Sequence, residues 1–80
     1  MRLPRDISAT ELISSLQKLG YFVSRQKGSH IRLTTTVNGV HHITVPNHST
    51  IRLGTFSSIL ADVAAHFKQP KEEIAKQLFG

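Results

Sequence analysis

Two alternating stretches on either side of the Asn-Gly pair at positions 38–39 constrain the fold of this chain more than any other feature. In residues 30–37 every second residue is apolar or threonine, and residues 40–45 end in a similar alternation. A period of two is typical of a strand with one buried face, and Asn-Gly is typical of a hairpin turn. The sequence therefore predicts an antiparallel hairpin of residues 30–37 and 40–45.

The length of the loop decides which side chains share a face. A two-residue turn at positions 38–39 would place the apolar residues of the second strand on the polar face. A three-residue loop at positions 37–39 pairs Leu33 with Ile43 instead. We prefer this second register because it gathers the apolar residues on one face: Ile31, Leu33, Ile43 and Val45.

The same register predicts an open polar face on the other side of the sheet. Its members are two histidines, an arginine and two threonines: His30, Arg32, Thr34, His42 and Thr44. Adjacent residues on a strand point to opposite faces, so His41 falls on the buried face, where we expect a structural role. We expect His66 to lie on a helix surface, away from the open face.

A helix and a further strand are predicted before the hairpin. Ser8 followed three residues later by Glu11 is typical of a capping box, and an apolar stripe follows over residues 9–19. Gly20 suits the left-handed end of this helix. Residues 21–26 are aromatic and β-branched at their start, which indicates the first strand.

Two helices are predicted after the hairpin. Thr55 is our expected N-cap for the first of them, whose apolar residues recur at helical spacing: Phe56, Ile59, Leu60, Val63, Ala64 and Phe67. Pro70 suits the start of a short extra helix at residues 70–79. The order predicts an α+β fold, α-β-β-β-α, with a three-stranded antiparallel sheet and helices on one face. We expect one domain over residues 1–80, with its core at about 3–67.

The charge distribution indicates a polyanionic partner. The chain carries ten Lys/Arg and five Asp/Glu, a net charge of +5, and it contains no cysteine. No acidic residue lies between Glu11 and Asp62, whereas five basic residues do: Lys18, Arg25, Lys27, Arg32 and Arg52. This segregation favours nucleic acid over general solubility as its explanation. Without a long apolar run or a signal-peptide pattern, we expect a cytoplasmic protein with no membrane partner.

Several kinds of catalytic site are disfavoured. The adjacent His41 and His42 point to opposite faces, and no carboxylate lies near them in the sequence, so a metal site is not expected. The shortage of carboxylates also argues against a Ser-His-acid triad. Gly28 stands alone and forms no phosphate-binding loop. We therefore expect neither a metal nor another cofactor.

Metal-free chemistry on a phosphodiester fits the stretch around His30. RNA cleavage of this kind needs a base for the 2′-hydroxyl proton, cations for the charge at phosphorus and an acid for the leaving 5′-oxygen. Imidazole titrates near pH ~6.5 and suits proton transfer. Lys27 and Arg32 supply positive charge, and Gly28 lets the backbone approach a phosphate closely. His48 emerges near His30 in the preferred register and is our candidate for a second proton-transfer group.

Four segments carry a resemblance to a known family: Leu19-Gly20-Tyr21, Arg25-Gln26-Lys27-Gly28-Ser29-His30-Ile31-Arg32, Thr44-Val45-Pro46-Asn47-His48 and Gly54-Thr55-Phe56. Over about residues 3–67 the chain resembles the HicA-type toxins of bacterial toxin–antitoxin modules. The resemblance implies a fold like that of double-stranded-RNA-binding domains and an endoribonuclease that cleaves mRNA, an mRNA interferase. It implies that His30 is the catalytic residue. It also implies a HicB-type antitoxin that covers the active face.

RNA contacts are expected around the same turn, from Lys27, Gly28, Ser29, Arg32 and Arg25. Two alternatives stay open at this point. The first is a non-catalytic RNA-binding module of the same architecture, because a fold does not establish catalysis. The second is an interaction domain whose open β-face receives a protein partner.

Overall fold

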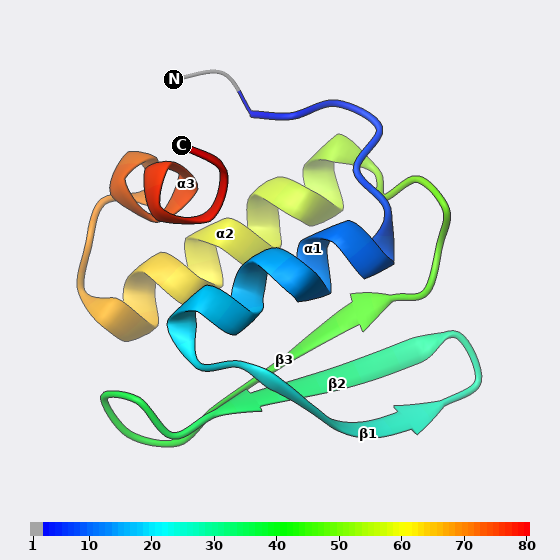
Figure 1. Ribbon diagram of the computed structural model, residues 1–80, viewed down its shortest axis with the longest axis horizontal. Coiled ribbons are helices and arrows are strands. Elements are labelled where there is room, and N and C mark those ends of the chain that lie inside the picture. The colour runs from blue at the N-terminus through cyan, green and yellow to red at the C-terminus, as the bar shows by residue number, and fades with distance from the viewer. Residues whose placement is uncertain (1–2) are drawn as a thin grey trace.

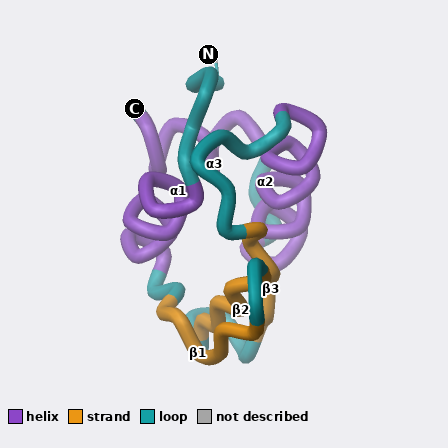
Figure 2. The backbone as a smooth tube through the Cα atoms, turned by 90° about the vertical axis from the view of Figure 1, so that its right-hand side faces the viewer, coloured by secondary structure: helices purple, strands orange, loops and turns teal. Residues whose placement is uncertain are grey.

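A computed structural model of the protein describes residues 3–80 and has the predicted α+β architecture (Figure 1). In chain order its elements are α1 (Ala9–Leu16), the 3-10 helix η1 (Gln17–Leu19), β1 (Phe22–Lys27), β2 (His30–Thr35), β3 (His41–Pro46), α2 (Leu53–Phe67) and α3 (Lys71–Phe79). The strands form one antiparallel sheet in the order β1-β2-β3. All the helices lie on one side of this sheet, and its other face is left open (Figure 2). Among residues 3–80, no helix has the length and apolarity needed to cross a bilayer.

The first helix begins and ends as predicted. The Ser8 hydroxyl accepts a hydrogen bond from the Glu11 N–H, and the Glu11 carboxylate accepts one from the Ser8 N–H, both at 3.1 Å. Gly20 ends η1 with a φ of +85°. A Cβ at this position would lie 2.7 Å from Cγ2 of Val37. Glycine is therefore required both by the left-handed backbone and by the close approach of the hairpin loop.

The predicted register of the hairpin is confirmed, but β2 ends at Thr35 instead of residue 37, and β3 begins and ends one residue later than expected. Leu33 pairs with Ile43, and the last pair of the ladder joins Thr35 to His41. Beyond that pair the Thr35 hydroxyl accepts from the Val37 N–H and donates to the Leu19 carbonyl. The Asn38 side chain donates to the carbonyl of His66 on α2. The loop therefore bonds to the helices, which ends the ladder one pair earlier than a loop of residues 37–39 would.

The predicted start of the second helix is wrong. The helix begins at Leu53 with Arg52 at the N-cap, and no side chain caps it, so Thr55 lies inside the first turn. The physical reason is a tertiary contact of the preceding residue. Ile51 is buried, and its N–H donates to the Ile7 carbonyl at 2.8 Å, which fixes the chain just before the helix. The buried anchor at residue 51 overrides the local preference of threonine for the cap.

The core lies between the sheet and the helices. It takes buried side chains from α1, α2, α3, β2 and β3: Leu12, Leu16, Leu33, Val45, Phe56, Leu60, Val63, Ile74 and Leu78. Every residue of β1, by contrast, is exposed. The third helix is part of this core, and Phe79 at its end meets Phe56 edge-to-face with ring centroids 5.6 Å apart. The sheet face opposite the core is not covered by helices and is accessible to a ligand or a partner.

Candidate functional site

Four basic or imidazole side chains lie together on the open face of the sheet. His30 begins β2 and pairs with Lys27 of β1, while Arg32 pairs with Arg25. Residues paired across an antiparallel ladder point to the same face, and so do residues two apart on one strand. All four are exposed. The structure therefore brings together four residues selected from the sequence, which we call the basic group: Arg25, Lys27, His30 and Arg32.

A β-bulge at Ser24 produces this arrangement. Val23 pairs with Leu33, but the next pair along the ladder is Arg25 with Arg32, so Ser24 is an extra residue. Strict alternation from Val23 would have turned Arg25 and Lys27 toward the helices. One inserted residue reverses the phase of the strand and turns both cations to the face of His30. No pattern in the sequence predicts this bulge.

The turn before His30 consists of Gly28 and Ser29. Gly28 has a φ of +57°, and a Cβ there would meet no atom within 4 Å. The left-handed backbone, and not steric crowding, therefore accounts for a glycine here, because the space around its Cα is open. The Ser29 carbonyl accepts a hydrogen bond from the Asn47 N–H at 2.6 Å. This bond ties the turn to the segment that leaves β3.

His48 lies in that segment, beside the turn. Pro46, two residues earlier, pairs with His30. The His48 N–H donates to the Pro46 carbonyl, and the His48 carbonyl accepts from the Ala9 N–H at the start of α1. The backbone of His48 is thus held near His30, while its side chain is exposed. The assignment of His48 as a second proton-transfer group stays a prediction.

One residue expected on the open face is in fact buried. Thr34 is only 6% exposed. Its hydroxyl forms hydrogen bonds with the Ser24 hydroxyl at 2.7 Å and with Nδ1 of His42 at 2.8 Å. The chain Ser24–Thr34–His42 runs across all three strands and covers the threonine from both sides. This row separates the basic group at one end of the face from the hairpin loop at the other.

The charge of the basic group is not offset by nearby carboxylates. Within residues 3–80, the one pair at ion-pair distance joins His41 to Asp62 at 3.3 Å. That pair involves none of Arg25, Lys27 and Arg32. In the same part of the chain, no three His, Asp or Glu side chains form a group that could hold a metal ion.

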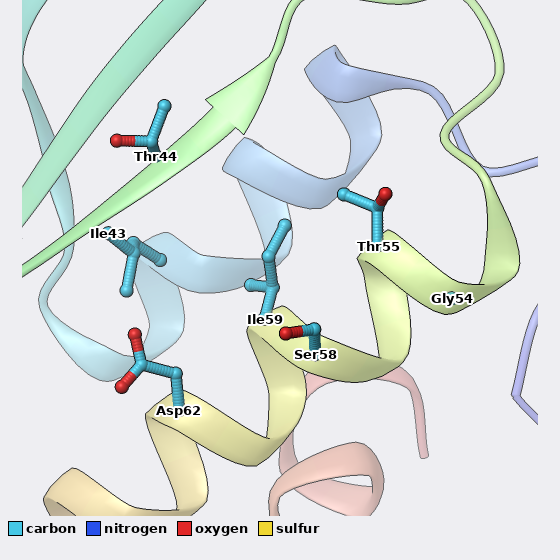
Figure 3. A pocket seen from close by; sticks show the side chains of 7 residues that line it. All are labelled: Ile43, Thr44, Gly54, Thr55, Ser58, Ile59 and Asp62. Carbon is cyan, nitrogen blue, oxygen red and sulfur yellow. The ribbon is translucent and has the colours of Figure 1, made fainter.

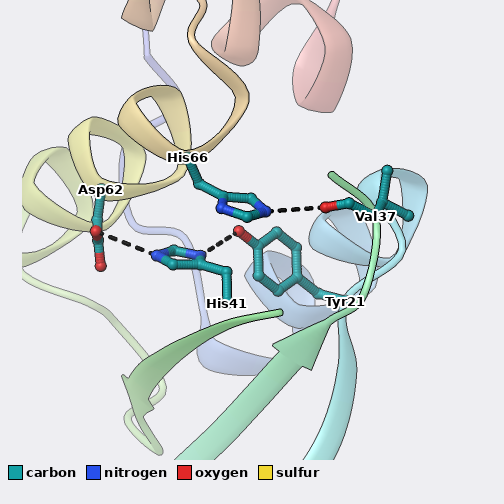
Figure 4. Close-up of polar contacts among 5 residues, drawn as sticks. All are labelled: Tyr21, Val37, His41, Asp62 and His66. Atoms are coloured by element: carbon teal, nitrogen blue, oxygen red, sulfur yellow. Dashed lines mark hydrogen bonds and ion pairs between the residues drawn. The ribbon is translucent and has the colours of Figure 1, made fainter. Parts of the chain in front are cut away.

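His41 and His66 belong to a polar cluster on the helix side of the hairpin (Figure 4). Nε2 of His41 donates to the Asp62 carboxylate at 3.3 Å, and its Nδ1 forms a hydrogen bond with the Tyr21 hydroxyl at 2.8 Å. Its ring stacks on that of His66, with centroids 4.4 Å apart, and Nε2 of His66 donates to the Val37 carbonyl at 2.9 Å. The contacts of His41 agree with the structural role predicted for it. His66 lies on the surface of α2 and away from the open face, as expected, and hydrogen bonding and stacking also join it to the hairpin.

The phenol of Tyr21 makes this cluster sensitive to alkali. Burial raises the pKa of Tyr21 to about 12, and the Asp62 carboxylate adds to the rise. The folded state therefore favours the neutral phenol, and its stability is unaffected below the unfolded pKa near 10. We expect the free energy of unfolding to fall by roughly 2–3 kcal/mol as the pH rises from about 10 to 12. Urea denaturation across this range measures the fall.

Tyr21→Phe is the matched variant for this prediction. It keeps the ring that meets Phe67 edge-to-face and removes the titrating group. The variant loses about 1 kcal/mol at neutral pH with its hydrogen bond to His41, but its stability should decline less between pH 10 and 12. An equal decline in both proteins would contradict the assignment. Because the chain has a single tyrosine and no tryptophan, tyrosinate absorbance reports this group alone.

Comparison with known proteins gives one match. The model of a family described as "HicA toxin of bacterial toxin-antitoxin" matches residues 9–64, which is more than half of the chain. The matched span runs from α1 through the sheet and most of α2, and it leaves out α3. No curated protein and no solved structure matches.

Proposed function

The chain belongs to the HicA toxin family of bacterial toxin–antitoxin systems, and on that basis we propose that it is an endoribonuclease that cleaves mRNA. Membership implies an antitoxin as its partner. We propose a HicB-type antitoxin that covers the open β-face. One observation supports the proposal most: the exposed imidazole of His30 lies among three cations, and no carboxylate of residues 3–80 is within ion-pair distance of them.

The proposed reaction is a transfer within the RNA backbone. A base takes the proton of a 2′-hydroxyl, the 2′-oxygen bonds to the adjacent phosphorus, and the bond from phosphorus to the 5′-oxygen breaks. The departing 5′-oxygen receives a proton from an acid. The products are a 2′,3′-cyclic phosphate and a 5′-hydroxyl. His30 supplies the base or the acid, and His48 is the proposed second group.

The neighbours of His30 are proposed to bind the RNA and stabilise its transition state. Negative charge develops on the phosphate oxygens as the 2′-oxygen attacks, and Lys27 and Arg32 lie on the face where it would form. The open turn at Gly28 and Ser29 admits a phosphate close to the backbone. Arg25 extends the positive surface along β1. We propose that the reaction uses no metal or other cofactor.

The proposal is tested by incubating the purified protein with a defined RNA and identifying the product ends. Cleavage is expected with and without EDTA, and the new 5′ ends are expected to carry hydroxyl groups. A matched RNA with a single 2′-deoxynucleotide at the cleaved position should resist, because it lacks the nucleophile. Binding without any product would contradict cleavage and favour a non-catalytic RNA-binding module. Loss of cleavage with EDTA would contradict the metal-free mechanism.

Arg25 is expected to improve RNA binding at a cost in stability. It lies directly opposite Arg32, and like charges in such a pair destabilise a sheet. Arg25→Gln should therefore raise the free energy of unfolding by about 0.2–1 kcal/mol. The same change should weaken binding of single-stranded RNA and reduce the slope of log K against log salt by about 0.7. Urea denaturation and salt titrations measure the two effects.

Lys76→Gln is the control for this experiment. Lys76 is an exposed cation near the end of α3, on the far side of the sheet from the basic group. Its replacement should leave the salt slope unchanged and should not stabilise the protein. Equal effects of the two substitutions on RNA binding would show that only net charge matters, and would contradict a defined binding face.

A further inference from the structure

A groove lies beside the free edge of β3, between that strand and α2 (Figure 3). Its volume is about 480 Å³, within the range of roughly 300–1,000 Å³ that is usual for small-ligand sites. The lining comes from two consecutive residues of β3 and from the first three turns of α2: Ile43, Thr44, Gly54, Thr55, Ser58, Ile59 and Asp62. None of the residues proposed for RNA cleavage or for RNA contacts on the open face lines this groove.

The groove adjoins the basic group of the open face. Thr44 lines it and also pairs with Arg32 across the ladder, so it belongs to both surfaces. His30 pairs with Pro46, which lies two residues along β3 from Thr44. At ~3.3 Å per residue this step is about 7 Å, close to the spacing of one nucleotide in an extended strand. A single-stranded RNA with a phosphate at His30 can therefore place a nearby base at the groove.

The floor and the walls of the groove differ in chemistry. Ile43 and Ile59 are nearly buried and give it an apolar floor. The hydroxyl-bearing residues Thr44, Thr55 and Ser58 line its sides, and the Asp62 carboxylate stands at one end (Figure 3). This is an apolar surface with a few directed polar groups, as a planar heterocyclic ligand requires.

Asp62 decides which ligand fits. It is the one acidic residue between Glu11 and Glu72, and its side chain is 58% exposed. Its Oδ1 accepts from Nε2 of His41, while a carboxylate offers about four acceptor positions in all. A negative charge repels phosphate, so the groove suits a part of the RNA that donates hydrogen bonds. Single-stranded RNA is commonly recognised through the Watson–Crick edges of unstacked bases.

We propose that the groove between β3 and α2 binds one unstacked base of the RNA and prefers guanine. The Watson–Crick edge of guanine presents two parallel N–H donors, from N1 and the 2-amino group, which match the two oxygens of a carboxylate. The edges of adenine, cytosine and uracil present no such pair. The apolar floor packs against the face of the base, and the hydroxyls bond to its remaining polar atoms. This inference rests on RNA as the ligand of the open face, but it does not rest on cleavage.

The test measures binding of short oligouridines that contain one guanosine, inosine or adenosine at the centre. The His30→Ala protein is used, so that the RNA stays intact, and fluorescence anisotropy gives the dissociation constants at one fixed salt concentration. Guanosine should bind roughly tenfold more tightly than adenosine. Inosine keeps the N1–H and lacks the 2-amino group, so its affinity should fall between them.

Asp62→Asn is expected to reduce the preference for guanosine over adenosine to about twofold or less. Glu72→Gln removes the same charge from an exposed position on α3 and should leave the preference intact. Ser58→Ala removes a hydroxyl from the groove and leaves the contact between Asp62 and His41 in place. Its effect on binding therefore reports on the groove and not on the polar cluster. It should weaken binding of the guanosine oligonucleotide by several-fold.

Equal affinities for the three oligonucleotides would overturn the inference and assign the groove to another occupant, such as an extended peptide of a protein partner. A preference that survives Asp62→Asn would overturn it as well. Failure of the proposed function has a different signature. If RNA binds with a base preference and the wild type never cleaves it, the proposed base site in the groove is supported and the proposed endoribonuclease activity is contradicted. If RNA does not bind at all, both are wrong.

Discussion

Replacing His30 with alanine is expected to lower the rate of RNA cleavage by roughly 10²–10⁴-fold and to leave the protein folded. The rate falls because a positioned general acid or base contributes about this much to proton transfer. The fold survives because His30 is exposed at the first residue of β2 and takes no part in the core. Single-turnover cleavage of a defined RNA measures the rate, and urea denaturation measures the stability.

Two other histidines serve as matched controls. His42 is exposed on the same face but forms a hydrogen bond with Thr34, and His42→Ala should change the cleavage rate by only a few-fold. His48→Ala should reduce the rate by an intermediate factor if His48 is the second proton-transfer group. A His30→Ala protein that cleaves at the wild-type rate, in a preparation free of other nucleases, would remove His30 from the mechanism.

Replacing Ile74 with alanine is expected to lower the free energy of unfolding by about 2–5 kcal/mol. Ile74 lies on α3, is fully buried and packs in the same core as the side chains of α1 and α2. The substitution removes apolar contacts and leaves a cavity beneath the helix. For a small domain whose total stability is about 5–15 kcal/mol, this loss is large. Chemical denaturation followed by circular dichroism measures it.

This prediction tests whether α3 belongs to the folding unit, although the family match stops at residue 64. Lys76→Ala, on the exposed side of the same helix, should cost less than about 1 kcal/mol. Leu78→Ala should behave like the Ile74 variant, because Leu78 is equally buried. A loss below about 1 kcal/mol for both core variants would mean that α3 is a dispensable appendage.

The sequence was sufficient to predict the register of the hairpin. Only one loop length places Leu33 opposite Ile43. Because both residues must be buried on the same face, this requirement determines the register. The capping box at Ser8 and the left-handed end at Gly20 are local signals, and both are confirmed. These features could be predicted because each depends on residues that are close in sequence or on a simple period.

Other features depend on contacts between distant parts of the chain. The bulge at Ser24 has no sequence signal, because Phe22 and Val23 are half exposed at an edge strand and give no alternation to interrupt. The stacking of His66 on His41 depends on how the end of α2 meets the hairpin. The start of α2 depends on the buried Ile51. In each case tertiary packing determines which local conformation is adopted, because the local sequence favours none of the alternatives strongly.

The bulge at Ser24 has a second consequence, for the solubility of the protein. A regular edge strand offers an unbroken row of backbone donors and acceptors to any other strand, and edges with exposed apolar residues promote aggregation. β1 is such an edge, with Phe22 and Val23 half exposed. The extra residue interrupts the row at its middle, and Arg25 and Lys27 bring positive charge to the same edge, which repels a second copy. One irregularity in the backbone therefore protects the sheet from pairing with other sheets.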